Sequence, residues 1–246
     1  MIFVVDGKVS RKIKGGENVP FNIINFQVSV QINNRHICSG IIIGENWILT
    51  SATCVILDNN VVFGNIKIRA GSNDLSDIYS CSISFYDVSL VIIYPEFDVY
   101  DFWVNDICLL KLSTEMIIDK WHVNIARIVQ VGEAVKHRLH VSGWGEHRSD
   151  GSSNPHYLQR ISIERTKHEV CFRYYHRLLD TNQFCAFGVP RSSSVTQGDS
   201  GSPICDYRKI YGVVSILLLL NDGQEPFLYT KVVNYNYWIE EIKLKY

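Results

Sequence analysis

The stretch "TQGDSGSPI", Thr196 to Ile204, places one serine, Ser200, inside a turn that is rich in glycine. In such a turn, backbone N–H groups can converge on the oxygen of a reacting carbonyl and stabilise the negative charge that develops there. A lone glycine–serine turn also occurs in proteins without catalytic activity. Its meaning therefore depends on which residues elsewhere in the chain could act together with Ser200.

The composition describes a chain that can bury a sizeable hydrophobic core. It has 246 residues, of which 46% are hydrophobic, and its formal net charge is −1. That charge provides neither a basic footprint for nucleic acid nor an attraction to an anionic membrane. The longest apolar run, 215–220, is far shorter than the roughly 20 residues that span a bilayer. We expect one or two domains, and neither nucleic acid nor a membrane as partner.

Seven cysteines are many for a cytosolic chain of this length, and they indicate an oxidising compartment. Because the count is odd, at least one thiol is free or is bonded to another chain. The first twelve residues do not read as a signal peptide, since their apolar run is too short and their basic residues come too late. A signal that had already been removed would leave no trace. From the cysteine content we expect a secreted protein.

Short runs rich in Val, Ile, Tyr and Phe recur along the chain, with turn residues between them. Several of them alternate apolar and polar side chains, as half-buried antiparallel strands do. The clearest runs are 26–32, 65–71, 85–94, 134–143 and 210–216. Apolar residues at helical spacing predict a helix at 232–245, and 166–179 is a second helical candidate. This pattern predicts an all-β pair of barrels that ends in a helix.

Further motifs accompany the serine turn. The stretch "NDICLLKL", Asn105 to Leu112, puts Asp106 at the head of an apolar strand, where a carboxylate could orient a catalytic base. The stretches "VSGWGEH", "GVVS" and "YTKVVNYNYWI" follow at the expected intervals. Together these motifs resemble the trypsin/chymotrypsin family of serine proteases, from residue 13 to residue 246. The resemblance implies two antiparallel six-stranded β-barrels with a catalytic cleft between them.

The resemblance also divides the chain into parts. Residues 1–12 would be a pro-segment or a remnant of the expressed sequence, and residues 13–246 the trypsin-like domain. We expect the two barrels at roughly 24–128 and 129–231, followed by the C-terminal helix at 232–245.

The first residues of that domain resemble an activation site. Cleavage after Lys12 would free Ile13, and in active relatives the new terminal ammonium pairs with the aspartate that stands at Asp199 here. We interpret this set of residues as an inherited activation remnant.

The resemblance places a threonine at the position of the general base. Active relatives read "LTAAHC" where this chain reads "LTSATC", residues 49–54, so Thr53 replaces the histidine. A threonine hydroxyl has no useful basicity near neutral pH and cannot take the proton of Ser200. Loss of the histidine from such a triad lowers turnover by about 10⁶-fold.

The other triad positions are expected to persist without a catalytic role. Asp106 would remain as a buried carboxylate that is hydrogen-bonded to Ser215. Ser200 would be an inert hydroxyl, and with Gly198 it would form a remnant of the oxyanion hole. His36 is the histidine nearest to the site in sequence, but its position in the family lies behind the cleft. We do not expect His36 to replace the missing base.

The resemblance predicts an occluded specificity pocket as well. Ser194 stands where trypsins carry the aspartate that binds a Lys or Arg side chain. Two glycines normally line the pocket beside the position of Ser215, and here Leu217 and Phe227 replace them. Each replacement adds a bulky apolar group, so we expect the pocket to be partly or wholly filled.

The cysteines fall into two groups on the same basis. The family pairs four of them: Cys38 with Cys54, and Cys171 with Cys185. Three are left over: Cys81, Cys108 and Cys205. Two interpretations of these three stay open, because two of them could pair with each other or all could be buried thiols that pack as small apolar residues.

Among relatives, the chain is most similar to mite gut trypsins and to the inactivated protease paralogues of the scabies mite. That resemblance implies a pseudoprotease of a parasite that binds host proteins, complement components among them, and so helps it to evade immunity. We expect a monomer that requires no cofactor and no metal. Two alternatives stay open: a weak or altered serine hydrolase that uses Ser200, and a non-catalytic gut protein.

Overall fold

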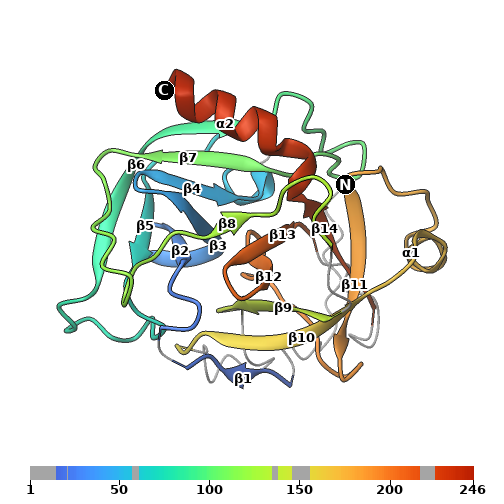
Figure 1. The fold of residues 1–246 in the computed structure, drawn as a ribbon, viewed down its shortest axis with the longest axis horizontal. Coiled ribbons are helices and arrows are strands. Elements are labelled where there is room, and N and C mark those ends of the chain that lie inside the picture. Colours follow the sequence, from blue (N-terminus) through green and yellow to red (C-terminus); the bar gives the residue numbers. More distant parts are fainter. Residues whose placement is uncertain (1–14, 21, 57–60, 135–137, 146–155, 217–224) are drawn as a thin grey trace.

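The computed structural model describes residues 15–20, 22–56, 61–134, 138–145, 156–216 and 225–246. Two closed, six-stranded antiparallel β-barrels lie side by side, and a C-terminal helix runs along one end of the molecule (Figure 1). The predicted fold class, an all-β pair of barrels with a terminal helix, is confirmed. No helix among the described residues is long and apolar enough to cross a membrane.

The first barrel is built from the N-terminal half of the chain. Its strands close in the order β2-β3-β4-β7-β6-β5. They are β2 (Gln27–Ile32), β3 (Arg35–Gly44), β4 (Trp47–Thr50), β5 (Ile66–Ala70), β6 (Ser84–Ile93) and β7 (Cys108–Leu112). A short 3₁₀ helix, η1 (Ala52–Cys54), follows β4. Apolar side chains at every second position of these strands, such as Val28 and Val30 of β2, fill the interior of this barrel.

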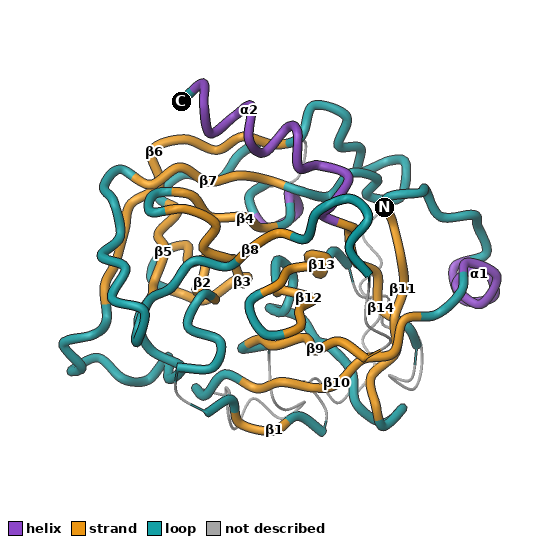
Figure 2. The backbone as a smooth tube through the Cα atoms, in the orientation of Figure 1, coloured by secondary structure: helices purple, strands orange, loops and turns teal. Residues whose placement is uncertain are grey.

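The second barrel closes in the order β9-β10-β11-β14-β13-β12, with β12 pairing back onto β9. Its strands are β9 (Arg138–Gly143), β10 (Gln159–Arg165), β11 (Gln183–Val189), β12 (Pro203–Asp206), β13 (Lys209–Val214) and β14 (Phe227–Lys231). Two short strands add to its edges, β1 (Glu17–Asn18) on β10 and β8 (Arg127–Ile128) parallel to β13. Figure 2 shows that both α-helices lie at the periphery of the strands.

The interface between the two barrels has an apolar part and a polar part. Apolar side chains from both barrels and from the C-terminal helix form one buried cluster, which includes Phe26, Leu49, Leu109, Val213 and Ile239. Beside it, the outward face of β2 is polar yet buried: the Gln27 side chain donates to the Ser142 carbonyl oxygen at 2.9 Å, across the interface. Because these polar groups are hydrogen-bonded, they can be buried without a large free-energy cost. They add hydrogen bonds between the two barrels, and the candidate site lies at this interface.

The predicted elements agree with the structure in kind and differ at their ends. The helix expected at 232–245 is a 3₁₀ turn, η3 (Val232–Tyr235), followed by α2 (Asn236–Lys245). The candidate at 166–179 is helical only as α1 (His168–Tyr175), since His176 adopts a left-handed conformation with φ of 53° and ends the helix. The apolar run at 215–220 lies mostly outside the described residues.

Candidate functional site

Thr53 and Asp106 meet at the interface of the two barrels. The η1 helix holds Thr53, and Asp106 lies directly before β7. The Thr53 backbone N–H donates to Asp106 Oδ1 at 2.9 Å, and its hydroxyl donates to Oδ2 at 3.0 Å. From the second barrel, the Ser215 hydroxyl donates to the same Oδ2 at 2.6 Å. The hydrogen bond expected between Asp106 and Ser215 is therefore present.

Ser51, which was not among the predicted site residues, extends this chain of hydroxyls. Its Oγ lies 2.9 Å from Thr53 Oγ1. Because the Thr53 proton is already donated to Asp106, Ser51 is the donor to Thr53. The signal was available in the sequence, since "LTSATC" departs from the pattern of active relatives at residue 51 as well as at residue 53. The result is a run of hydroxyls, Ser51 to Thr53 to Asp106, in which every proton already has an acceptor.

Asp106 is fully buried, and burial raises its pKa from 3.8 to about 6. The hydrogen bonds from Ser215 and Thr53 favour the ionised form and offset part of this effect. At neutral pH the carboxylate is therefore ionised but poorly solvated, and hydroxyl and amide donors stabilise its charge. Thr230 fixes its backbone by donating to the Asp106 carbonyl oxygen at 3.0 Å.

This environment makes stability depend on pH. Between pH 3.8 and about 6 the folded chain keeps a proton on Asp106 that the unfolded chain releases, so the free energy of unfolding falls as the pH rises. The loss amounts to about 3 kcal/mol once the pH exceeds the folded pKa. Asp106→Asn removes this titration, so its free energy of unfolding should not fall in this way. We expect the difference in free energy of unfolding between variant and wild type to shift by about 3 kcal/mol in favour of the variant as the pH rises from acidic to mildly alkaline. Urea unfolding of both proteins across that range measures the difference, and parallel pH profiles would contradict it.

The serine turn is wedged between the barrels. The Ser39 N–H of β3 donates to the Ser200 carbonyl oxygen at 2.8 Å, and the Gly201 N–H donates to Val214 at 2.8 Å. Gly201 has a φ of +79°, and a Cβ there would lie 2.1 Å from the Ser39 oxygen, so only glycine fits. Ser200 itself is half-buried, and within the described residues its hydroxyl makes no hydrogen bond. The backbone of the turn is thus hydrogen-bonded to both barrels, while the Ser200 hydroxyl is left without a partner among the described residues.

Asp199, the neighbour of Ser200, is fully buried. Its carboxylate accepts the N–H of Gly145 at 2.8 Å and the N–H of Thr196 at 2.7 Å. Burial raises its pKa to about 7. Gly143 and Gly145 make room for it, because a Cβ at either position would lie 2.0 or 2.4 Å from a carboxylate oxygen. The proposed activation remnant also includes Lys12 and Ile13, which lie outside the described residues.

His36 faces the serine turn, but its tautomer and its hydrogen-bond partners do not suit a base for Ser200. Its Nε2 lies 3.1 Å from the Gly198 carbonyl oxygen, and its Nδ1 lies 2.9 Å from Ser29 Oγ. A carbonyl oxygen can only accept, so Nε2 carries the proton and Nδ1 accepts from the serine. Burial lowers the pKa of His36 to about 4. The ring is thus a neutral donor to Gly198, and its basic nitrogen accepts from Ser29 and not from Ser200.

The residues assigned to the specificity pocket are buried where the structure describes them. Phe227 begins β14 opposite Ala186 and is fully buried in the core of the second barrel, among Val195, Val214 and other apolar residues. Ser194 and Ser215 are buried as well. Leu217 lies outside the described residues. The aromatic ring of Phe227 is therefore part of the barrel core.

The cysteines form the two expected disulfides, Cys38–Cys54 and Cys171–Cys185. The first joins β3 to the end of η1 and so anchors the helix that carries Thr53. The other three thiols are free, which excludes a disulfide among them. Cys108 and Cys205 are buried, and burial raises the pKa of the Cys205 thiol to about 12. Cys81 is exposed, so the interpretation of all three as buried thiols is wrong for that residue.

Comparison with known proteins agrees with this architecture. The trypsin family model matches residues 13–239 of the chain. Anionic trypsin of Bos taurus is 30% identical over 232 residues, which cover 94% of this chain and 89% of that protein. Serine protease 1 of Homo sapiens is 29% identical over 233 residues, which cover 93% of this chain and 88% of that protein.

A solved structure shows the same fold. Neuropsin, a serine protease expressed in the limbic system of mouse brain, superposes with a TM-score of 0.81 over 93% of this chain and 99% of its own, at 23% identity. The match of the family model over nearly the whole chain agrees with the two barrels and with the serine turn between them. The chain belongs to the trypsin-like serine protease family.

Proposed function

We propose that this chain is a catalytically inactive member of its family, which acts by binding proteins of a host. One observation carries the proposal: the hydroxyl of Thr53 donates to Asp106 where a catalytic base would have to accept a proton from Ser200. In an active triad the aspartate orients an imidazole, whose free nitrogen deprotonates the serine. Here the carboxylate accepts from hydroxyl and amide donors, and among the described residues no hydrogen-bonded side chain links it to Ser200.

Two further observations support the absence of peptide hydrolysis. His36 cannot supply the missing base, because its protonated nitrogen donates to Gly198 and burial holds its pKa near 4. Phe227 fills core space at a position where the family resemblance places a pocket wall. A cleaving enzyme needs both a base and a site for the substrate side chain, and each is compromised by a different residue.

The class of partner follows from the resemblance to inactivated protease paralogues of the scabies mite. It suggests complement components, bound outside the parasite's cells as a means of immune evasion. A secreted protein is supported by the two disulfides, because such bonds form and persist in oxidising compartments.

Retention of serum proteins tests the proposal. The folded chain is immobilised beside bovine anionic trypsin whose active serine has been blocked with a fluorophosphonate, so that the control has the same fold and no activity. We expect complement proteins to be retained on the chain and not on the blocked trypsin, as identified by mass spectrometry. Recovery of the same proteins from both columns, or of none from the chain, would contradict the proposal and favour a non-catalytic gut protein.

One observation favours a second candidate, a weak hydrolase: the Ser200 hydroxyl is half-buried and free of hydrogen bonds within the described residues. Without a base we expect a fluorophosphonate to leave no adduct on Ser200, because an unassisted hydroxyl reacts about 10⁶-fold more slowly than a triad serine. Intact-mass measurement after incubation detects the adduct, with bovine anionic trypsin as the positive control. An adduct that Ser200→Ala abolishes would establish the hydrolase and overturn the inactive assignment.

A further inference from the structure

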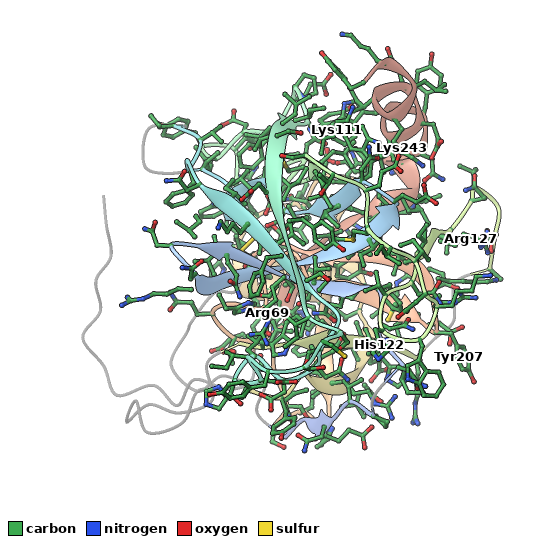
Figure 3. The ribbon with its side chains drawn as sticks, turned by 90° about the vertical axis from the view of Figure 1, so that its left-hand side faces the viewer. Arg69, Lys111, His122, Arg127, Tyr207 and Lys243 are labelled. Atoms are coloured by element: carbon green, nitrogen blue, oxygen red, sulfur yellow. A yellow bond between two sulfur atoms is a disulfide. The ribbon has the colours of Figure 1, made fainter. Side chains whose placement is uncertain are left out.

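A large concave surface lies mainly on the first barrel and extends to Trp144, His156, Gln197 and Gly198 beside the serine turn. It has a volume of about 1050 Å³ and lies between the β2–β3 hairpin, strands β5 and β6, and the loop that follows β5. We call it the basic groove and define it by six of its lining residues: Arg35, Ile37, Lys67, Arg69, Ile78 and Phe85. Figure 3 views the molecule from the side on which the first barrel lies, with Arg69 labelled.

We propose that the basic groove binds an extended, acidic segment of a partner protein, with an apolar or aromatic side chain between its carboxylates. This inference rests on the proposed binding function and names the surface and the chemistry that would carry it.

The charged side chains that line the groove, as far as the structure describes them, are all cationic. Arg35, Lys67 and Arg69 line it, and the described lining residues include no carboxylate. Arg35 is exposed and forms no ion pair within the described parts of the chain. Lys67 has only a long contact, 3.9 Å from Asp87, and 44% of its side chain is exposed. Both cations can therefore meet an incoming carboxylate without first breaking a strong ion pair.

Arg69 is buried at this surface and held there by hydrogen bonds. It is only 6% exposed, and its guanidinium donates to the backbone carbonyl oxygens of Asp74, Leu75 and Asp77. Its Nε is buried and has no hydrogen-bond partner among the described residues. The charge is thus fixed at the base of the groove, with one donor unused. The carboxylates of Asp74 and Asp77 offset part of this charge, so Arg35 and Lys67 dominate the selection of an anion.

Apolar groups stand beside these cations. Ile78 is 71% exposed and Phe85 is 55% exposed, while the buried ring of Trp144 lies deeper in the groove. Single exposed apolar side chains are common, but here two of them line one concavity together with the cations. Burial of an apolar side chain of the partner against Ile78 and Phe85 would add to the attraction of its carboxylates.

These features favour a protein segment over other anions. Nucleic acid requires a longer track of cations than three residues, and the chain as a whole has a net charge of −1. The strands beneath the groove belong to a closed barrel and offer no free edge for an added strand. Recognition must therefore come from side chains, and cations beside apolar groups match an acidic segment that contains a large apolar residue.

The first experiment uses a peptide of defined chemistry. A fluorescein-labelled peptide of repeated Glu-Glu-Phe units is titrated with the full chain, and binding is followed by fluorescence anisotropy. We expect the double variant Arg35→Glu with Lys67→Glu to bind it at least about tenfold more weakly. The matched control, Arg173→Glu with Arg208→Glu, makes the same change in net charge at exposed positions outside the groove and should bind like the wild type. Circular dichroism checks that both variants are folded.

Two peptide controls separate the charged and apolar contributions. Gln-Gln-Phe repeats should lose binding because they lack carboxylates, and Glu-Glu-Ser repeats because they leave Ile78 and Phe85 without an apolar partner. Equal binding by the two double variants, or no binding by the wild type, would overturn the proposal. A dimer of the wild-type chain that the groove variant dissociates would overturn it too, because the occupant would then be a second copy of the chain.

Serum retention by the same proteins keeps this inference distinct from the proposed function. If the groove variant retains the same serum proteins as the wild type, the binding function stands and the groove is the wrong surface. If the wild type retains none, the binding function fails, whatever the peptide does. Elution of the retained proteins by the Glu-Glu-Phe peptide, but not by Gln-Gln-Phe, would support both.

Discussion

Replacing Thr53 with histidine will rebuild the base beside Ser200 without restoring cleavage of Lys or Arg peptides. The backbone N–H of residue 53 will still donate to Asp106 Oδ1, and an imidazole can replace the hydroxyl that now donates to Oδ2. A small fluorophosphonate should then label Ser200, and we expect labelling to become faster by about 10³-fold or more. Peptide cleavage should stay at least about 10⁴-fold below that of bovine anionic trypsin, because the family resemblance predicts neither an open cavity nor a charge partner for the substrate side chain.

The two readouts test different parts of the site. The labelling rate reports the base, whereas peptide cleavage also requires the pocket that the resemblance places at Ser194, Leu217 and Phe227. Thr53→Asn is the matched control, since it changes the same position without adding a base and should gain neither activity. Rapid cleavage of Lys peptides by Thr53→His would show that the pocket is open, and the assignment of Phe227 to it would be wrong.

Phe227→Ala is expected to lower the free energy of unfolding by about 3–5 kcal/mol. The ring is fully buried in the core of the second barrel, and its removal would leave a cavity lined by apolar side chains. Since domains are stable by only about 5–15 kcal/mol, this loss is a large part of the total. Urea unfolding at neutral pH measures it, with far-ultraviolet circular dichroism as the probe.

The control for this prediction is Phe172→Ala, which removes the same ring from the surface of α1, where 45% of the residue is exposed. We expect that variant to lose less than about 1 kcal/mol. Should Phe227→Ala prove as mild as the control, the ring would not be packed in the core. A large loss would also explain why a pocket cannot be reopened by one substitution, because glycine at residue 227 would destabilise the barrel.

The fold was predictable because its signals are local and repeated. Alternation of apolar and polar residues marks strands such as β2 and β5, and the serine turn and its accompanying motifs resemble one family along most of the chain. The ends of elements were less predictable, as at α1, where the left-handed conformation of His176 ends a pattern that continues in the sequence.

The candidate site was predictable only in part. The pairing of Asp106 with Ser215 followed from the resemblance, but the donation from Ser51 through Thr53 depends on the shape of η1 and on the depth at which Asp106 is buried. Likewise, the sequence places His36 near the site without saying which nitrogen carries the proton. That assignment needs the Gly198 carbonyl, which is 162 residues away along the chain.

By itself, then, the sequence determined the family, the two barrels and the threonine at residue 53, because each can be recognised from residues that are adjacent or regularly spaced. Only the tertiary structure decided that Phe227 belongs to a core, that Cys81 is exposed, and that Arg35, Lys67, Ile78 and Phe85 line one groove. The physical reason is that burial and concavity are properties of surfaces that meet when barrels close. Residues far apart in the chain form such buried and concave surfaces together, so no local sequence pattern predicts them.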